Sequence, residues 1–149
     1  MKIEILPKYR IAYLRQVGPY GPANKEVMEK LKQWADEKNL LTESAVIYGI
    51  PQDHPVTTLA ENCRYDACIV ISNDLLLDDS VCESEQAGGE YIVCKVKHTA
   101  EDIKKAWAEI IPAILNSGYQ IDNKPIIERF SLEMINNHYC ELCVPVISI

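Results

Sequence analysis

The stretch that decides the fold class spans residues 88–118 and reads GGEYIVCKVKHTAEDIKKAWAEIIPAILNSG. A turn and a strand over 88–97 lead to Thr99, a residue type that favours helix N-caps, and Gly118 marks the end of the helix. Apolar residues recur at helical spacing and form one broad stripe: Ile103, Ala106, Trp107, Ile110, Ile111, Ile114 and Leu115. Pro112 falls inside this helix, so we expect a kink or a break there.

The same order of elements occurs twice. Alternating apolar residues, helical spacing and Gly/Pro-rich turns predict helices over 24–38 and 100–117, and strands over 8–17, 44–50, 64–71, 88–97, 124–135 and 139–149. The chain then consists of two β-α-β-β repeats, 1–75 and 88–149, in a single domain over 1–149. We expect an α+β fold with pseudo-twofold symmetry, in which the helices cover one side of an antiparallel sheet and a ligand groove lies at its centre.

An alignment of the two repeats relates particular residues. Laying YDACIVI (65–71) on CELCVPV (140–146) matches Asp66 with Glu141 and Cys68 with Cys143. Laying AVIYGIP on PIIERFS in the preceding strands matches Tyr48 with Glu128.

The last strand separates into two faces, because successive side chains of a strand point to opposite sides. One face is wholly apolar, as a surface under a helix should be: Cys140, Leu142, Val144 and Val146. The other is mixed and reads as the wall of a pocket: Tyr139, Glu141, Cys143 and Pro145. If Glu128 of the preceding strand shares that face, two carboxylates lie in a partly desolvated groove. Such carboxylates have raised pKa values and favour flat, lipophilic cations, and one of them could act as a general acid or base.

Composition narrows the function classes. The 149 residues are 48% hydrophobic and 25% charged, and the net charge of −7 argues against binding of nucleic acid phosphates. No apolar run approaches the roughly 20 residues that span a bilayer, and the N-terminus lacks a secretion signal, so we expect a cytoplasmic protein. The acidic stretch 78–85 is expected to be a solvated loop. We expect no cofactor and no metal, since Cys140 and Cys143 would point to opposite sides of their strand and the six cysteines would stay reduced.

Five segments in this order resemble the GyrI-like small-molecule-binding family, which is also the effector-binding domain of AraC-type and MerR-type regulators: VGPYGPA, DHPVT followed by CRYDACIVI, GGEYIVCKVKHTAEDIKKAW, KPIIERF and CELCVPV. The resemblance covers almost the whole chain. It implies a central groove with Glu128 and Glu141 at its floor and with an aromatic wall formed by Tyr20, Tyr48, Trp107 and Tyr139. Phe130 and Cys143 are added to the expected ligand-binding residues. Cys143 stands where relatives often have an aromatic residue, and the chain has no helix-turn-helix segment, so we expect a stand-alone domain that does not bind DNA directly.

Three functions follow from the resemblance. The first is binding of small, lipophilic, cationic or electrophilic aromatic compounds, which would protect against toxic molecules. The second is hydrolysis of strained cyclopropane-bearing electrophiles, with Glu141 or Glu128 as the base. The third is inhibition of DNA gyrase through a protein partner that the sequence does not identify. Structural roles stay open too: Glu141 could pair with Arg64, Arg129 or a lysine, and Glu128 could be an exposed strand residue.

Overall fold

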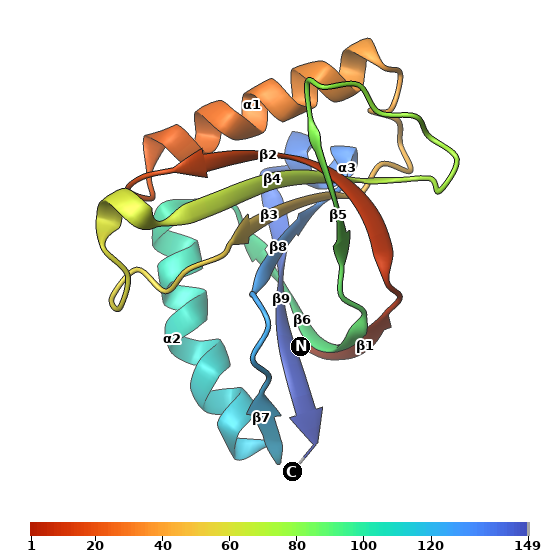
Figure 1. Ribbon diagram of the computed structural model, residues 1–149. Helices are drawn as coiled ribbons and strands as arrows, with labels where there is room; N and C mark the ends of the chain where they lie inside the picture. The colour runs from red at the N-terminus through yellow and green to blue at the C-terminus, as the bar shows by residue number, and fades with distance from the viewer. Residues whose placement is uncertain (149) are drawn as a thin grey trace.

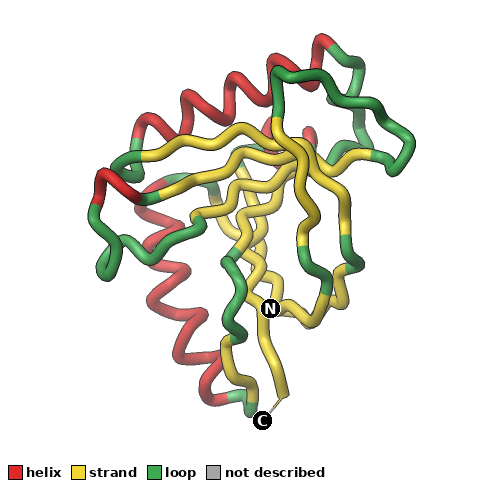
Figure 2. The backbone as a smooth tube through the Cα atoms, viewed as in Figure 1, coloured by secondary structure: helices red, strands yellow, loops and turns green. Residues whose placement is uncertain are grey.

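The computed structural model describes residues 1–148 and contains one curled antiparallel sheet with two long helices (Figures 1 and 2). The strands are β1 (Lys2–Leu6), β2 (Tyr9–Val17), β3 (Ile47–Pro51), β4 (Arg64–Ile71), β5 (Cys82–Gln86), β6 (Gly89–Lys97), β7 (Tyr119–Ile121), β8 (Ile127–Phe130) and β9 (Tyr139–Ser148). The helices are α1 (Pro22–Glu37), α2 (Ala100–Asn116) and α3 (Leu132–Asn136), with a 3-10 turn η1 (Ala60–Asn62).

The order of the strands in the sheet confirms the predicted duplication. It runs β1-β6-β9-β8-β3-β4-β2-β5, with β7 added beside β9. Strands β3 and β8 meet at the centre, and each begins one half: β3-β4-β2 with helix α1, and β8-β9-β6 with helix α2. The fold is therefore α+β with two pseudo-symmetric repeats, and the sheet curls into a half-barrel (Figure 1).

The two edge strands pair across the halves of the sheet: β1 precedes β2 in the chain but pairs with β6, and β5 precedes β6 but pairs with β2. The segments β1-β2 and β5-β6 therefore run antiparallel along one another, and this ribbon joins the two ends of the curled sheet. Gly88 lies where the two segments bend, and a Cβ on it would lie 2.7 Å from the carbonyl oxygen of Leu6 and 2.9 Å from the backbone nitrogen of Lys8. Only glycine allows the backbones to approach this closely.

Both long helices cover the same face of the sheet, which we call the helix face. Helix α1 packs on β2 and β4, while α2 packs on β6 and β7. Their buried residues are those that the apolar spacing predicts, including Leu31 on α1 and Ile110 on α2. As expected, Thr99 caps α2, where its side chain accepts a hydrogen bond from the backbone nitrogen of Asp102. Pro112 does not split α2, which runs unbroken to Asn116.

The opposite, concave face of the half-barrel holds a second apolar cluster. Its buried members are Leu6, Ile11, Tyr48, Ile50, Cys68, Tyr91, Val93, Ile127 and Cys143. The sheet is thus buried on both faces over much of its area. No helix within residues 1–148 is long and apolar enough to span a membrane.

Two sequence predictions about secondary structure were wrong in detail. The segment 124–135 is not one strand, since β8 ends at Phe130 and Ser131 caps the short helix α3 by accepting a hydrogen bond from the backbone nitrogen of Met134. The acidic stretch 78–85 is not all loop, because β5 begins at Cys82 and pairs with β2. Strands β1 and β7 were not predicted at all.

The alignment of the repeats is correct for one strand pair and shifted for the other. When β9 is laid on β4 with Glu141 on Asp66, Cys143 falls on Cys68. Ile127 of β8 lies opposite Cys143, and Tyr48 of β3 lies opposite Cys68. Tyr48 therefore corresponds to Ile127 and not to Glu128. A shift of one residue moves a side chain to the other face of a strand, so this shift changes which residues can share a site.

Candidate functional site

Glu128 and Glu141 do not share a face, which overturns the expected pair of carboxylates. In the β8-β9 register Glu128 lies opposite Leu142, and Arg129 lies opposite Glu141. Leu142 belongs to the cluster under the helices, so Glu128 points to the helix face and Glu141 points to the concave face. The predicted site residues fall into two sets on opposite sides of the sheet.

Glu141 forms an ion pair with an arginine, which is the structural role that the sequence left open for it. Nε of Arg129 donates to its carboxylate at 3.0 Å, and Nη2 of Arg129 lies 2.8 Å from the carboxylate of Glu4 on β1. Arg129 and Glu141 are both largely buried, with 14% and 11% of their side chains exposed. The arginine therefore joins β8, β9 and β1 across the concave face, and the charge of Glu141 is already compensated.

Three other predicted residues lie on the side of Glu141. Tyr48 and Cys143 are fully buried members of the concave-face cluster, where burial raises the pKa of the Cys143 thiol to about 12. A buried thiol that stays protonated near neutral pH is a poor nucleophile. Tyr139 is half-buried, and the ammonium of Lys95 lies 5.0 Å from the centre of its ring. These contacts are packing and charge contacts within the protein.

The remaining predicted aromatic residues belong to the helix face. Trp107 and Tyr20 are partly buried against the cluster under the helices, and Phe130 is a buried member of it. The Tyr20 hydroxyl lies 2.8 Å from the carbonyl oxygen of Arg64 and accepts a hydrogen bond from the backbone nitrogen of Asp53. Tyr20 therefore anchors the loop between β3 and β4 to the start of α1.

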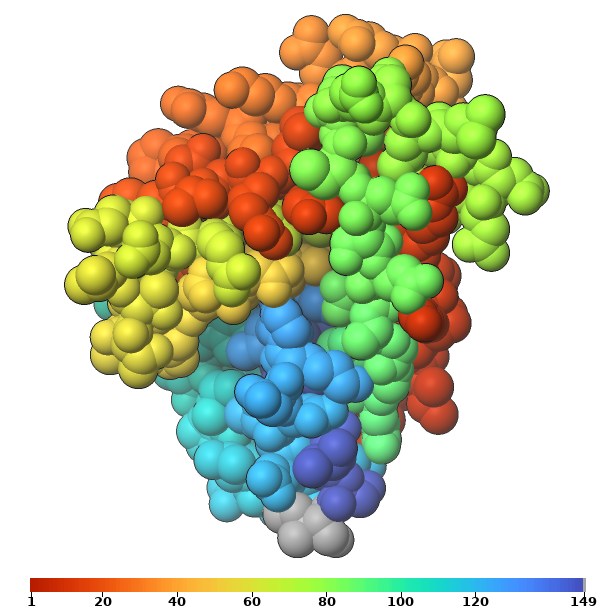
Figure 3. Space-filling view, in the orientation of Figure 1, coloured from red at the N-terminus to blue at the C-terminus, as the bar shows by residue number. Residues whose placement is uncertain are grey.

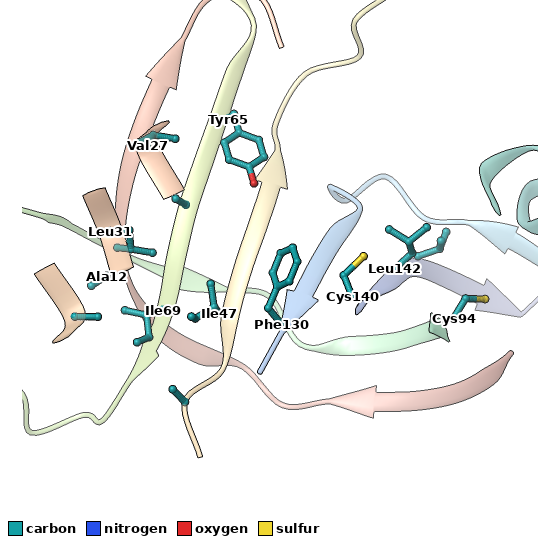
Figure 4. Packing of buried hydrophobic residues seen from close by; sticks show 14 of the residues in the cluster. Ala12, Val27, Leu31, Ile47, Tyr65, Ile69, Cys94, Phe130, Cys140 and Leu142 are labelled. Carbon is teal, nitrogen blue, oxygen red and sulfur yellow. The ribbon is translucent and has the colours of Figure 1, made fainter. Parts of the chain in front are cut away.

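Glu128 lies in the gap between the two helices. Strands β3 and β8 are the central strands, flanked by the areas that α1 and α2 cover. Figure 4 shows Tyr65 and Phe130 in this middle region, with Leu31 on one side and Cys94 on the other. The Glu128 side chain is 24% exposed, so the carboxylate is largely buried yet reaches the solvent. We call Tyr65, His98, Glu128 and Phe130 the inter-helix site.

The electrostatics of the inter-helix site differ from those of Glu141. Burial raises the pKa of Glu128 to about 7. Within residues 1–148 no lysine or arginine lies within ion-pair distance of its carboxylate, and Nε2 of His98 is 4.0 Å away. The His98 pKa is itself lowered, mainly by burial and further by the charge of Lys32. Near neutral pH the imidazole is neutral, so an ionised Glu128 has no cationic partner.

Tyr65 completes the inter-helix site, and sequence reasoning missed it. Its hydroxyl lies over Gly49, where a Cβ would collide with the phenol, and Gly49 is the direct cross-strand neighbour of Glu128. Cross-strand neighbours lie about 5 Å apart, which brings the phenol next to the carboxylate. The signal was the glycine in the middle of a buried strand, which often marks a close approach of another group.

The cysteines alternate as predicted. Cys140 lies in the cluster under the helices and Cys143 in the concave-face cluster, so the two cannot bind one metal ion. Within the part of the chain that the structure describes, no group of three His, Cys, Asp or Glu residues is placed to hold a metal.

A family model described as "GyrI-like small molecule binding domain" matches residues 1–147. The chain belongs to this family. Its fold has two repeats, a curled sheet and helices on one face, and the inter-helix site lies between those helices.

Two curated relatives illustrate the spread of GyrI-like proteins. The chain is 42% identical over 145 residues to YosT of Bacillus subtilis, an SPbeta prophage-derived protein named as a transcriptional regulator, and the match covers 97% of both chains. It is 29% identical over 147 residues to a DNA gyrase inhibitor of Salmonella arizonae, covering 93% of this chain and 92% of the relative.

Solved structures share the fold at low sequence identity. The protein EcmrR, in a complex with DNA, matches 99% of this chain with a TM-score of 0.78 and 14% identity, and the match covers 57% of the EcmrR chain. SAV2435 bound to tetraphenylphosphonium matches 98% of this chain and 93% of its own, with a TM-score of 0.58 and 12% identity. A hydrolase from Listeria innocua matches 98% of this chain and 91% of its own, with a TM-score of 0.67 and 12% identity.

Proposed function

We propose that this GyrI-like domain binds small, lipophilic organic cations at the inter-helix site, with the Glu128 carboxylate as their counter-ion. The observation that carries the proposal is the state of Glu128, a largely buried carboxylate with a raised pKa and with only a neutral imidazole nearby. Binding of a cation removes the cost of ionising this group in a poorly solvated place.

The surroundings suit a ligand that is both charged and apolar. The phenol ring of Tyr65 lies beside the carboxylate, and so does the ring of Phe130, which makes an edge contact with His98 at 5.0 Å between ring centres; both rings are buried, so a ligand reaches them by entering between the helices. Aromatic faces attract cations by about 0.5–2 kcal/mol. The solved relative SAV2435 was obtained with tetraphenylphosphonium, a lipophilic cation, which makes this compound the natural first probe.

The test is titration of wild type and Glu128→Gln with tetraphenylphosphonium at pH 8 by calorimetry. Loss of a charge-assisted contact worth about 1.5–3 kcal/mol should weaken binding about 10- to 100-fold. Glu37→Gln is the matched control, since Glu37 is an exposed carboxylate at the end of α1. Equal affinity of wild type and Glu128→Gln would refute the proposal.

A protective role for the protein follows from the same site. A host that produces the wild-type chain should tolerate more tetraphenylphosphonium than one that produces Glu128→Gln at the same level. Equal tolerance in the two hosts would exclude protection by sequestration at Glu128.

Hydrolysis of strained cyclopropane-bearing electrophiles is the second candidate, and one feature favours it. Glu128 has a pKa near 7, which suits a general base, and the Tyr65 phenol lies beside it as a potential hydrogen-bond donor. If such a substrate is turned over, Glu128→Gln should lower kcat about 10²- to 10⁴-fold and Tyr65→Phe should lower it as well. Absence of turnover by the wild-type protein would exclude this candidate.

Inhibition of DNA gyrase is the third candidate and rests on the name of the relative from Salmonella arizonae. A supercoiling assay with purified gyrase tests it directly. If the chain inhibits gyrase through its surface and not through the inter-helix site, Glu128→Gln should inhibit as well as wild type does.

A further inference from the structure

The concave face carries a cavity of about 310 Å³ that none of these functions uses. It opens at the centre of Figure 3, between β2, the loop after β3, β5 and the segment that leads into β8. Its lining residues are Ile11, Tyr13, Arg15, Gln52, Asp66, Ser84, Glu85, Gln86, Ala87, Lys124 and Pro125. This volume is at the lower end of the range of small-molecule sites.

A buried carboxylate organises one wall of this cavity. Asp66 is 3% exposed, and it accepts hydrogen bonds from Nε of Arg15 at 2.7 Å, from Nη2 of Arg15 at 2.9 Å and from Nε2 of Gln52 at 3.0 Å. Three donors occupy the carboxylate, so it holds the other two side chains in place and has little capacity left for a ligand.

The groups that stay free are mostly hydrogen-bond donors. Nη1 of Arg15 makes no hydrogen bond within residues 1–148, and the guanidinium lies 5.5 Å from the centre of the Tyr13 ring. The hydroxyls of Tyr13 and Ser84 likewise make no hydrogen bond with another residue of this range. Lys124 lies at the rim and is partly engaged, since its ammonium donates to the carbonyl oxygen of Gly88 at 2.9 Å and lies 3.4 Å from the carboxylate of Asp122, which leaves one N–H for a ligand.

Glu85, the other acidic lining residue, does not direct its carboxylate into the cavity. It forms an ion pair with Lys8 at 2.9 Å, and 64% of its side chain is exposed. Ser84 lies opposite Ile11 of the concave-face cluster in the β2-β5 register, so Glu85, one residue on, points to the other side of the strand.

From this arrangement we propose that the cavity is a second ligand site, distinct from the inter-helix site, and that it takes a small organic anion. The carboxylate of the ligand accepts hydrogen bonds from Nη1 of Arg15 and from Lys124. An aromatic or aliphatic body packs on Tyr13, Ile11 and Pro125. The two faces of one sheet thus select ligands of opposite charge.

Naphthalene-2-carboxylate is a suitable probe, because it combines a carboxylate with a flat apolar body. Titration of the ¹⁵N-labelled full chain should shift amide signals of β2, β5 and residues 122–124. Lys124→Gln should weaken binding about 5- to 20-fold, as expected for one charged hydrogen bond. Lys105→Gln, which removes an exposed charge on α2, is the control and should bind like wild type.

Two further measurements decide whether the site is separate. Ser84→Trp places a large ring at the exposed rim of the cavity and should abolish the shifts, while its unchanged circular dichroism shows that the fold is kept. Saturation with tetraphenylphosphonium should leave the affinity for the anion within about twofold. Shifts confined to other parts of the chain, equal binding by Ser84→Trp, or displacement of the anion by the cation would overturn the proposal.

Discussion

Glu128 and Glu141 lie on adjacent antiparallel strands, yet their carboxylates point to opposite faces of the sheet. The twelve residues between them include the helix α3, and the register that results places Leu142 and not Glu141 opposite Glu128. Glu141 is compensated by Arg129, whereas Glu128 is not compensated by any lysine or arginine within residues 1–148. The two glutamates that the resemblance placed in one groove therefore have different chemistry.

Binding of an organic cation at Glu128 should depend on pH. The free carboxyl has a pKa of about 7 and only its ionised form attracts the ligand, so affinity should be constant above about pH 8 and fall towards tenfold per pH unit below pH 6. Calorimetry with tetraphenylphosphonium between pH 5 and 9 measures this. The profile should be flat for Glu128→Gln, and a flat profile for wild type would contradict the role of Glu128.

The stability of the ligand-free protein should also depend on pH because of Glu128. The pKa of Glu128 is higher in the folded state, about 7 against 4.5, so the folded state binds the proton more tightly. The free energy of unfolding should therefore fall as pH rises from about 4.5 to 7, by about 2–3 kcal/mol from this group. Urea unfolding should show that Glu128→Gln loses this slope and is more stable than wild type at pH 8; equal stability at pH 8 would argue against the buried state of Glu128.

Removal of Arg129 should be strongly destabilising. Arg129→Met leaves the carboxylates of Glu141 and Glu4 without their partner on the concave face, and breaking a buried ion pair in this way costs about 3–5 kcal/mol. The double variant Arg129→Met/Glu141→Leu should recover much of the loss in urea unfolding. A loss below about 1 kcal/mol for the single variant would show that the pair has little effect on stability.

Any side chain at position 49 should lower the stability of the fold while Tyr65 is present. A Cβ in Gly49→Ala would collide with the Tyr65 phenol, which should cost about 1–3 kcal/mol, as overpacking of a core usually does. In a Tyr65→Leu background the same substitution should cost much less, because the phenol is gone. Similar losses in both backgrounds, measured by thermal unfolding, would mean that the two residues do not meet.

The sequence predicted the parts of the fold that local patterns control. The apolar spacing of α1 and α2, the cap at Thr99 and the alternation along β9 each depend on neighbouring residues, and each agrees with the structure. The alternation also predicted correctly that Cys140 and Cys143 lie on different faces. The edge strands β1 and β5 were missed because their short segments are stabilised by pairing with the other repeat.

The composition of the candidate site was decided by the tertiary structure. An error of one residue in matching Tyr48 with Glu128 was invisible in the sequence, because both β3 and β8 are apolar around these positions. Strand register depends on hydrogen bonds between segments far apart in the chain, and a shift by one residue reverses the direction of every side chain. The sequence alone therefore determined that a carboxylate and aromatic residues are available, while the pairing of β8 with β9 decided that Glu128 joins Tyr65 on the helix face and that Glu141 is neutralised by Arg129.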